Sequence, residues 1–214
     1  VEAVLKEAGV EQPPPVQRAV IVGHPLKATG SVKEDGTTVH TLWGELAWQL
    51  GGRPAYELLR KSDETATNPG EALDAVFKQC GAALILIDEW VAYARQLWGR
   101  EKMLPAGSFD TQFTFAQTLC EAARRAPNVL VLVSISASVS EQGDEGGLSA
   151  LTSLKMAVGR SNLIWRPATS DESFEIVRRR LFQTVLDPAH RDAVVKAFME
   201  LYRSNPQDFP SECK

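Results

Sequence analysis

The chain has 214 residues, of which 44% are hydrophobic and 23% are charged, so it can bury a substantial core as one large domain or two small ones. Its 27 acidic and 23 basic residues give a net charge of -4, which does not indicate nucleic-acid binding by the surface as a whole but does not exclude it for a longer parent protein. The longest apolar runs are far shorter than the roughly 20 residues that cross a bilayer, and the sequence has no signal pattern. Its three cysteines are too far apart to suggest disulfides or a zinc site. We therefore expect a cytoplasmic protein with no membrane partner.

The first third of the chain alternates short β-branched runs with stretches of helical length. This alternation predicts an α/β fold, a mostly parallel sheet flanked by helices. We expect the first strand at 19–22 and a solvent-facing ribbon with an Asp-Gly turn at 35–36. Leucines at helical spacing then predict a helix over 41–50, ended by Gly51.

The middle of the chain continues the same alternation. The string N-P-G-E at 68–71 predicts a helix capped by Asn68, because asparagine is a favoured cap and proline suits the first turn. That helix should reach about Gln79 and be followed by a strand at 83–87. The next long helix is expected from about Thr111 to Arg125, before Pro127.

The last part of the chain becomes mostly helical. The expected elements are a strand at 129–134, a helix at 148–159, a strand at 163–165, and two helices whose caps lie at 169–172 and 187–190. We therefore expect two parts. Residues 1–168 would form an α/β core fragment with strands two to five of its sheet, and residues 169–214 would form the start of a helical lid.

The octapeptide A-L-I-L-I-D-E-W at 83–90 places two acids at the end of an apolar run. A parallel strand buried on both faces reads as continuous aliphatic residues, and ligands bind beyond the carboxyl ends of such strands. In P-loop NTPases this is the Walker B position, where Asp88 would hold Mg²⁺ and Glu89 would polarise the attacking water. The alternative is a strand that ends in two solvated acids.

Two serines follow the second strongly apolar run. Ser134 and Ser136 occupy the position of the polar sensor residue in AAA-type ATPases, beside the γ-phosphate. If this interpretation holds, Asp88 should lie at the carboxyl edge of the sheet, near Ser134 and next to the strand that ends at Val22. The alternative is that serine is common at strand ends because it begins turns.

Two arginines are candidates for phosphate contacts. Arg160 lies between the helix at 148–159 and the last expected strand, where AAA-type proteins place an arginine finger that reaches into a neighbouring subunit. It could instead complement the dipole of the preceding helix. The arginines at 178–180 fan around one helix, so we assign one of them, Arg179, as a sensor that approaches the nucleotide from the lid, with the others solvated or in ion pairs.

A phosphate-binding loop of the form G-x-x-x-x-G-K-[ST] is absent from the sequence, and the glycine-bearing segment 23–30 has the wrong spacing. Either the protein is not an NTPase or that loop lies upstream of Val1. The chain begins with valine rather than methionine, so we expect it to be a fragment of a longer polypeptide.

Four strings carry a resemblance to a known family. The segments at 41–52, 84–97, 131–138 and 165–182 closely resemble a family of large prokaryotic AAA-type ATP-binding proteins that is still labelled a domain of unknown function, with some members near phage-defence genes. The resemblance implies an AAA-like core that lacks its P-loop strand, with Asp88 and Glu89 as the Walker B pair. It also implies Mg²⁺, ATP and other subunits of the same protein as partners of the full-length parent.

The leading hypothesis is therefore a fragment of an AAA-type ATPase that is inactive alone and holds neither ATP nor Mg²⁺. Its strand at 163–165 should pair with the strand at 129–134 or find another partner, because the P-loop strand between them is missing. The alternative is a protein-interaction module that does not depend on nucleotide. A Mg²⁺-dependent nuclease is disfavoured because no lysine or further acid falls at a supporting position.

Overall fold

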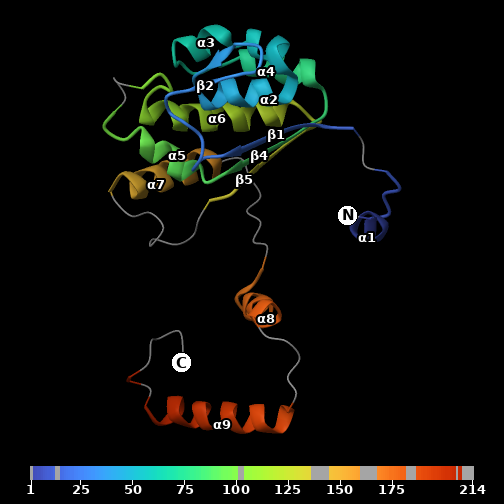
Figure 1. The fold of residues 1–214 in the computed structure, drawn as a ribbon, viewed down its shortest axis with the longest axis vertical. Helices are drawn as coiled ribbons and strands as arrows, with labels where there is room; N and C mark the ends of the chain where they lie inside the picture. The colour runs from blue at the N-terminus through green and yellow to red at the C-terminus, as the bar shows by residue number, and fades with distance from the viewer. Residues whose placement is uncertain are drawn as a thin grey trace. The chain divides into compact units, whose positions relative to one another are not determined.

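The computed structural model describes residues 2–12, 15–100, 104–135, 145–159, 168–181, 187–205 and 207–208 (Figure 1). The chain divides into two compact units, residues 1–163 and 164–214, and each is described by itself. Every described strand belongs to the larger unit. No helix in the described part of the chain has the length and apolarity needed to cross a membrane.

The larger unit is built on a three-stranded parallel sheet. Its strands are β1 (Gln17–Val22), β4 (Ala83–Asp88) and β5 (Val129–Val133), in the order β1-β4-β5. Val22 pairs with Asp88 and Ile87 pairs with Val133, so all three strands finish at the same edge. The predicted α/β architecture, a parallel sheet flanked by helices, is confirmed.

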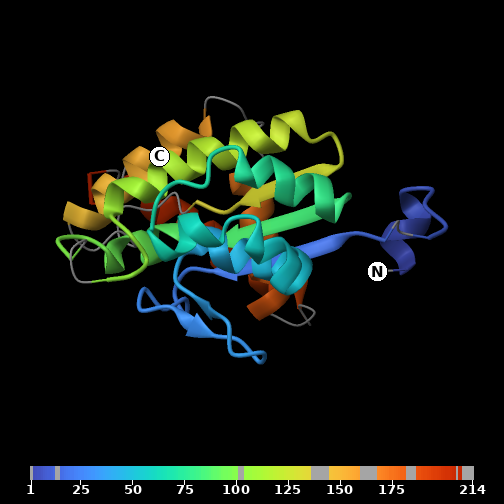
Figure 2. The same ribbon diagram turned by 90° about the horizontal axis from the view of Figure 1, so that it is seen from above.

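Helices cover one face of this sheet. The helices α2 (Leu42–Glu57), α4 (Ala72–Cys80) and α6 (Phe109–Arg125) lie on the same side of the strands (Figure 1), and the view from above shows them running over the sheet (Figure 2). Ile85 and Ile87 of the central strand are fully buried in the core that results. Each such aliphatic side chain contributes about 1.5–3 kcal/mol when it is fully buried.

The opposite face of the sheet carries exposed apolar side chains. The residues concerned are Val20, Val22, Leu86, Leu130 and Leu132, with exposed fractions from 36% to 56%. Successive side chains of a strand point to opposite faces, and these five lie on the face opposite α2, α4 and α6. The prediction that the two apolar strands are buried on both faces is therefore wrong for the described chain.

The helix α2 contains a break. The sequence predicts that Gly51 ends this helix, and the backbone does leave helical geometry at Gly51 and at Gly52, whose φ is 62°. The chain then resumes a helix that includes Pro54 and runs to Glu57. Proline suits the first turn of a helix, so the second stretch begins where the first one ends.

Two helices begin at residues other than those predicted. The side chain of Asn68 does not cap α4, because its amide donates a hydrogen bond of 2.8 Å to Oγ1 of Thr118 and the residue before α4 is Glu71. The cap of α6 is Ser108, whose Oγ accepts a 3.0 Å bond from the N–H of Thr111. Thr111 is therefore the third residue of α6 and not its start.

The helices α5 (Trp90–Gln96) and α7 (Glu145–Gly159) pack against each other, and α7 also packs against α6. α7 begins three residues before the predicted start at 148 and includes two glycines in its first turn. Gly146 lies against the indole of Trp98, where a Cβ atom would come within 2.8 Å of Cγ. The absence of a side chain at Gly146 therefore permits this contact.

Short elements complete the larger unit. They are α1 (Glu2–Glu7), the antiparallel pair β2 (Ser31–Val32) and β3 (Thr38–Val39), and α3 (Arg60–Glu64). The β2–β3 pair confirms the predicted ribbon around its Asp-Gly turn. α3, a helix of about one turn, has no counterpart among the predicted elements.

The smaller unit contains α8 (Ser170–Leu181) and α9 (Pro188–Ser204). Both predicted caps are present. The N–H of Thr169 donates a 2.8 Å bond to Glu172, and the side chain of Asp187 accepts a 3.0 Å bond from the N–H of His190. The strand predicted at 163–165, and its expected pairing with β5, fall outside the described residues.

Candidate functional site

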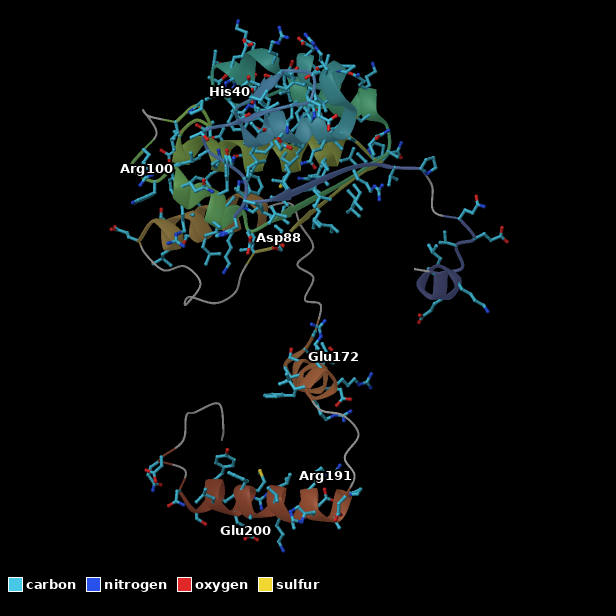
Figure 3. All side chains as sticks on the ribbon, in the orientation of Figure 1. His40, Asp88, Arg100, Glu172, Arg191 and Glu200 are labelled. Atoms are coloured by element: carbon cyan, nitrogen blue, oxygen red, sulfur yellow. The ribbon has the colours of Figure 1, made fainter. Side chains whose placement is uncertain are left out.

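Asp88 is the last residue of the central strand, at the carboxyl edge of the sheet (Figure 3). Its Oδ1 accepts a hydrogen bond from the hydroxyl of Ser134 and a second, of 3.0 Å, from the N–H of Glu89. Ser134 directly follows β5 and is fixed by its own N–H, which donates a 3.0 Å bond to the carbonyl of Ile87. The structure thus places Asp88, Glu89 and Ser134 together, as predicted, because parallel strands in register end side by side.

The second carboxylate oxygen of Asp88 is differently placed. Within the described residues, Oδ2 accepts no hydrogen bond, whereas Oδ1 accepts two. The side chain of Asp88 is half-buried, so Oδ2 keeps access to solvent. Carboxylate oxygens are the ligands that Mg²⁺ prefers, usually with several waters retained. Asp88 can therefore hold a hydrated cation while Ser134 fixes its orientation.

Glu89 adopts a left-handed backbone conformation, with φ 53° and ψ 35°. A residue with a side chain rarely adopts it, at a cost of about 1–2 kcal/mol. Its carbonyl accepts bonds of 3.0 Å from Ala92 and 3.3 Å from Tyr93, which begin α5. The turn therefore leads directly from the strand into the helix and leaves the carboxylate of Glu89 exposed at the edge of the sheet.

Gly23 supports this turn from the neighbouring strand. Its N–H donates a 2.8 Å bond to the carbonyl of Asp88, and a Cβ atom at this position would lie only 2.1 Å from the carbonyl oxygen of Glu89. The amide of Gln96 in α5 donates bonds of 3.0 Å to Leu26 and 3.4 Å to Gly23, which holds the loop after β1. Only glycine allows the two strand ends to approach this closely.

Sequence reasoning examines Gly23 only as part of a phosphate-binding loop and misses its packing role. The available signal is its position directly after an apolar strand that is predicted to run parallel to the Asp88 strand. The close approach itself depends on tertiary packing.

The other predicted site residues are Ser136, Arg160 and Arg179. Ser136 and Arg160 fall outside the described residues. Arg179 is exposed on α8, in the smaller unit, and its Nε donates a 2.8 Å bond to Glu175. Arg178 pairs with the same carboxylate, which holds the pKa of Glu175 at about 2, below its usual range. The ion pair of Arg178 agrees with the expectation for the arginines other than Arg179, and the assignment of Arg179 as a sensor stays a prediction.

A second polar cluster surrounds Asp63, which is completely buried. Its carboxylate accepts bonds from the N–H groups of His40 and Thr41, at 3.0 and 2.8 Å, and from the hydroxyl of Tyr56, at 2.9 Å. A Cβ atom on Gly44 would lie 2.1 Å from Oδ1 of Asp63, so the glycine makes room for this carboxylate. Sequence reasoning misses Asp63 because its partners on the His40 side lie more than twenty residues earlier in the chain.

The Asp63 cluster has the character of a structural link rather than a ligand site. Burial, and then the hydrogen bond to Asp63, raise the pKa of Tyr56 above its usual value, so its hydroxyl keeps the proton that it donates. The same carboxylate binds Thr41, which caps α2, and thereby joins α2 to α3. Among the residues that the structure describes, no three His, Cys, Asp or Glu side chains are grouped as metal ligands.

Comparison with known proteins gives one finding. Residues 16–153 match the family model of the DUF499 N-terminal domain, a domain of unknown function. The matched segment includes Gly23, Asp88, Glu89 and Ser134, the residues that form the edge site. No curated protein and no solved structure matches the chain.

Proposed function

The chain belongs to the DUF499 N-terminal domain family, and from that premise we propose that it carries the cation-binding and water-activating part of an AAA-type ATP-hydrolysing site. One observation carries this proposal. Asp88 ends the central strand with one oxygen held by Ser134, which directly follows the neighbouring strand, and Glu89 follows Asp88 in a strained turn.

The two acids have different roles in this proposal. Asp88 binds Mg²⁺ through Oδ2, directly or through water, while Ser134 keeps the carboxylate in one orientation. The carboxylate of Glu89 is exposed beside Asp88, so in this proposal it is the group that orients and deprotonates the attacking water. In this proposal Ser134 acts through Asp88, as a positioning residue, and not as a sensor beside the γ-phosphate.

A complete site also needs amides that cradle the phosphates, and the sequence lacks the G-x-x-x-x-G-K-[ST] loop that supplies them. We propose that this loop belongs to another segment of a longer polypeptide. Within the described residues, β5 pairs only with β4, so its other edge can accept the strand that leads into such a loop. The 214-residue chain alone should then bind ATP at this edge very weakly and should not hydrolyse it.

The second candidate function is a protein-interaction module that does not depend on nucleotide. The exposed apolar face of the sheet favours it, because contiguous apolar surface often marks a contact with another protein. In that case Asp88 and Glu89 only form the turn into α5, and substituting either acid would leave any ATP turnover of the longer protein unchanged.

The test is the Mg²⁺ dependence of ATP turnover in the longer protein, with Asp88→Asn compared against Asp110→Asn. We expect Asp88→Asn to lower turnover at least about a hundredfold and to raise the Mg²⁺ concentration needed, because one charge of the cation site is lost. Asp110 is exposed in the first turn of α6 and serves as the matched control, with turnover close to that of the unaltered protein. Equal turnover in the two variants would contradict the proposal.

A further inference from the structure

A basic pocket lies between the loop after β1 and the end of α5. This open hollow has a volume of about 510 Å³ and takes its polar lining from Lys27, Thr29, Arg95, Gln96 and Arg100, with the indole of Trp98 as its aromatic wall. Ligand pockets for small molecules typically span about 300–1,000 Å³. Figure 3 shows Arg100 and Asp88 at separate places in the larger unit.

The charge of this pocket has one sign among the lining residues that the structure describes. Lys27 and Arg100 contribute two positive charges, and no acidic residue is among the described residues that line the hollow. Lys27 and Arg100 are exposed, and neither forms an ion pair with a described residue. Like charges that converge on a concave surface attract an anion more strongly than the same charges spread over a flat one.

The loop that carries Lys27 is fixed rather than loose. The side-chain amide of Gln96 donates a 3.0 Å bond to the carbonyl of Leu26, directly before Lys27. The carbonyl of Lys27 in turn accepts a 3.0 Å bond from the N–H of Gly30. The ammonium group of Lys27 is therefore presented from an anchored turn, which lowers the entropy lost when an anion binds.

Trp98 is held in place but remains 43% exposed. Its ring packs edge-on against Phe109, with ring centroids 4.7 Å apart, and contacts Gly146 of α7. A large indole that stays partly exposed while two helices fix it can offer its free surface to a flat ring. Stacking of a nucleobase on an aromatic side chain contributes about 1–3 kcal/mol per base.

We propose that the basic pocket binds the phosphate of a nucleotide through Lys27 and Arg100, with the base against Trp98. Guanidinium and ammonium groups are the usual partners of phosphate oxygens, and the aromatic wall selects a phosphate that carries a ring. A free nucleotide and one nucleotide of a single strand present this same chemistry. The site is independent of Asp88, because cations neutralise the phosphate here and no Mg²⁺ is needed.

The experiment measures binding of three probes to the 214-residue chain, in EDTA and at low salt. Calorimetry measures the binding of AMP and of inorganic phosphate. Fluorescence anisotropy measures the binding of a labelled thymidine oligonucleotide of about ten nucleotides. We expect AMP or the oligonucleotide to bind, with an affinity that falls as salt rises. Arg100→Glu and Lys27→Glu should each weaken binding at least about tenfold, because a charge-assisted hydrogen bond is replaced by repulsion. Trp98→Leu should weaken binding of both ring-bearing probes while leaving that of inorganic phosphate unchanged.

Two controls isolate the pocket. Lys78→Glu makes the same charge change on the exposed surface of α4, and Asp88→Asn alters the proposed hydrolytic site. Both should bind the probes as the unaltered chain does, so failure of the ATPase proposal would leave this result intact. An oligonucleotide that binds much more tightly than AMP identifies a strand as the ligand, and equal affinities identify a free nucleotide.

Three results would overturn the assignment. The first is no binding of either nucleotide probe at roughly 1 mM. The second is an equal loss of affinity in Lys78→Glu and Arg100→Glu. The third is inorganic phosphate that binds as tightly as AMP, which would remove the role of Trp98. Thermal unfolding of each variant shows whether its fold is retained.

Discussion

Glu89 combines an exposed carboxylate with a backbone conformation that favours glycine. Strain of this kind persists when surrounding contacts fix it, and here Gly23 and the first turn of α5 do so. A glutamate in this conformation carries a cost that glycine would avoid, which is consistent with a use for its carboxylate. In the proposed site that use is the activation of water.

The conformational cost can be measured by replacing Glu89 with glycine. We expect the free energy of unfolding of Glu89→Gly to stay the same or rise by up to about 1 kcal/mol, because glycine adopts a positive φ without strain. The matched control is Glu121→Gly on the exposed side of α6, which should lose about 1 kcal/mol. Urea denaturation of both variants checks this, and equal losses would show that the turn at Glu89 is not strained in solution.

The sequence predicts part of the edge site and misses the rest. The closeness of Asp88 to Ser134 is predictable, because both lie at the ends of apolar runs and parallel strands end at one edge of a sheet. The roles of Gly23 and Asp63 are not, because each depends on backbone or side chains that are distant in sequence and meet only after packing.

At the scale of elements, local signals predict helix ends when the cap and its partner are close in sequence. The caps at Thr169 and Asp187 bond residues three positions away, and both are present. Asn68 has the same local pattern but bonds Thr118 of α6 instead, so a tertiary contact overrides the cap. The apolar strands show the corresponding limit, because a continuous apolar run does not reveal which face the helices cover.

The open face of the sheet leads to a prediction about two leucine-sized side chains. Leu130 is 56% exposed and Ile85 is fully buried, although they lie on adjacent strands. We expect Leu130→Ala to lower the free energy of unfolding by less than about 1 kcal/mol, and Ile85→Ala to lower it by about 2–5 kcal/mol. Chemical denaturation of the 214-residue chain compares them. Similar losses would show that the outer face of the sheet is covered in solution.

For the whole molecule, the α/β architecture is predictable because short, continuous β-branched runs alternate with stretches of helical length and helical spacing. The hydrolytic function stays a prediction, because the match to a domain of unknown function fixes the family without fixing an activity.

The stability of the folded chain should also depend on alkaline pH. Burial first, and the charges of Asp63 and Glu45 second, raise the pKa of Tyr93 above its usual value of 10.0. Because the raised pKa belongs to the folded state, its stabilisation is present below pH 10 and is lost as the pH rises further. We expect Tyr93→Phe to weaken this alkaline loss of unfolding free energy.

The same variant should be nearly neutral at pH 7. The hydroxyl of Tyr93 is buried and has no hydrogen-bond partner in the described part of the chain, so removing it breaks no bond. Tyr56→Phe is the contrasting variant, because it removes the hydroxyl that donates to Asp63 and should cost about 1.5–3 kcal/mol at pH 7. Urea denaturation between pH 7 and pH 11 tests both, and an unchanged pH profile for Tyr93→Phe would contradict the assignment.

The most direct test of the central claim is ATP turnover and ATP binding by the Glu89→Gln variant of the longer protein, measured side by side. Glutamine keeps the size of the side chain but cannot take a proton from water, and Glu89 does not contact the phosphates in the proposed site. We therefore expect turnover to be abolished while ATP affinity stays within a few-fold of that of the unaltered protein. Turnover at the unaltered rate would contradict the claim that Asp88 and Glu89 form a hydrolytic pair.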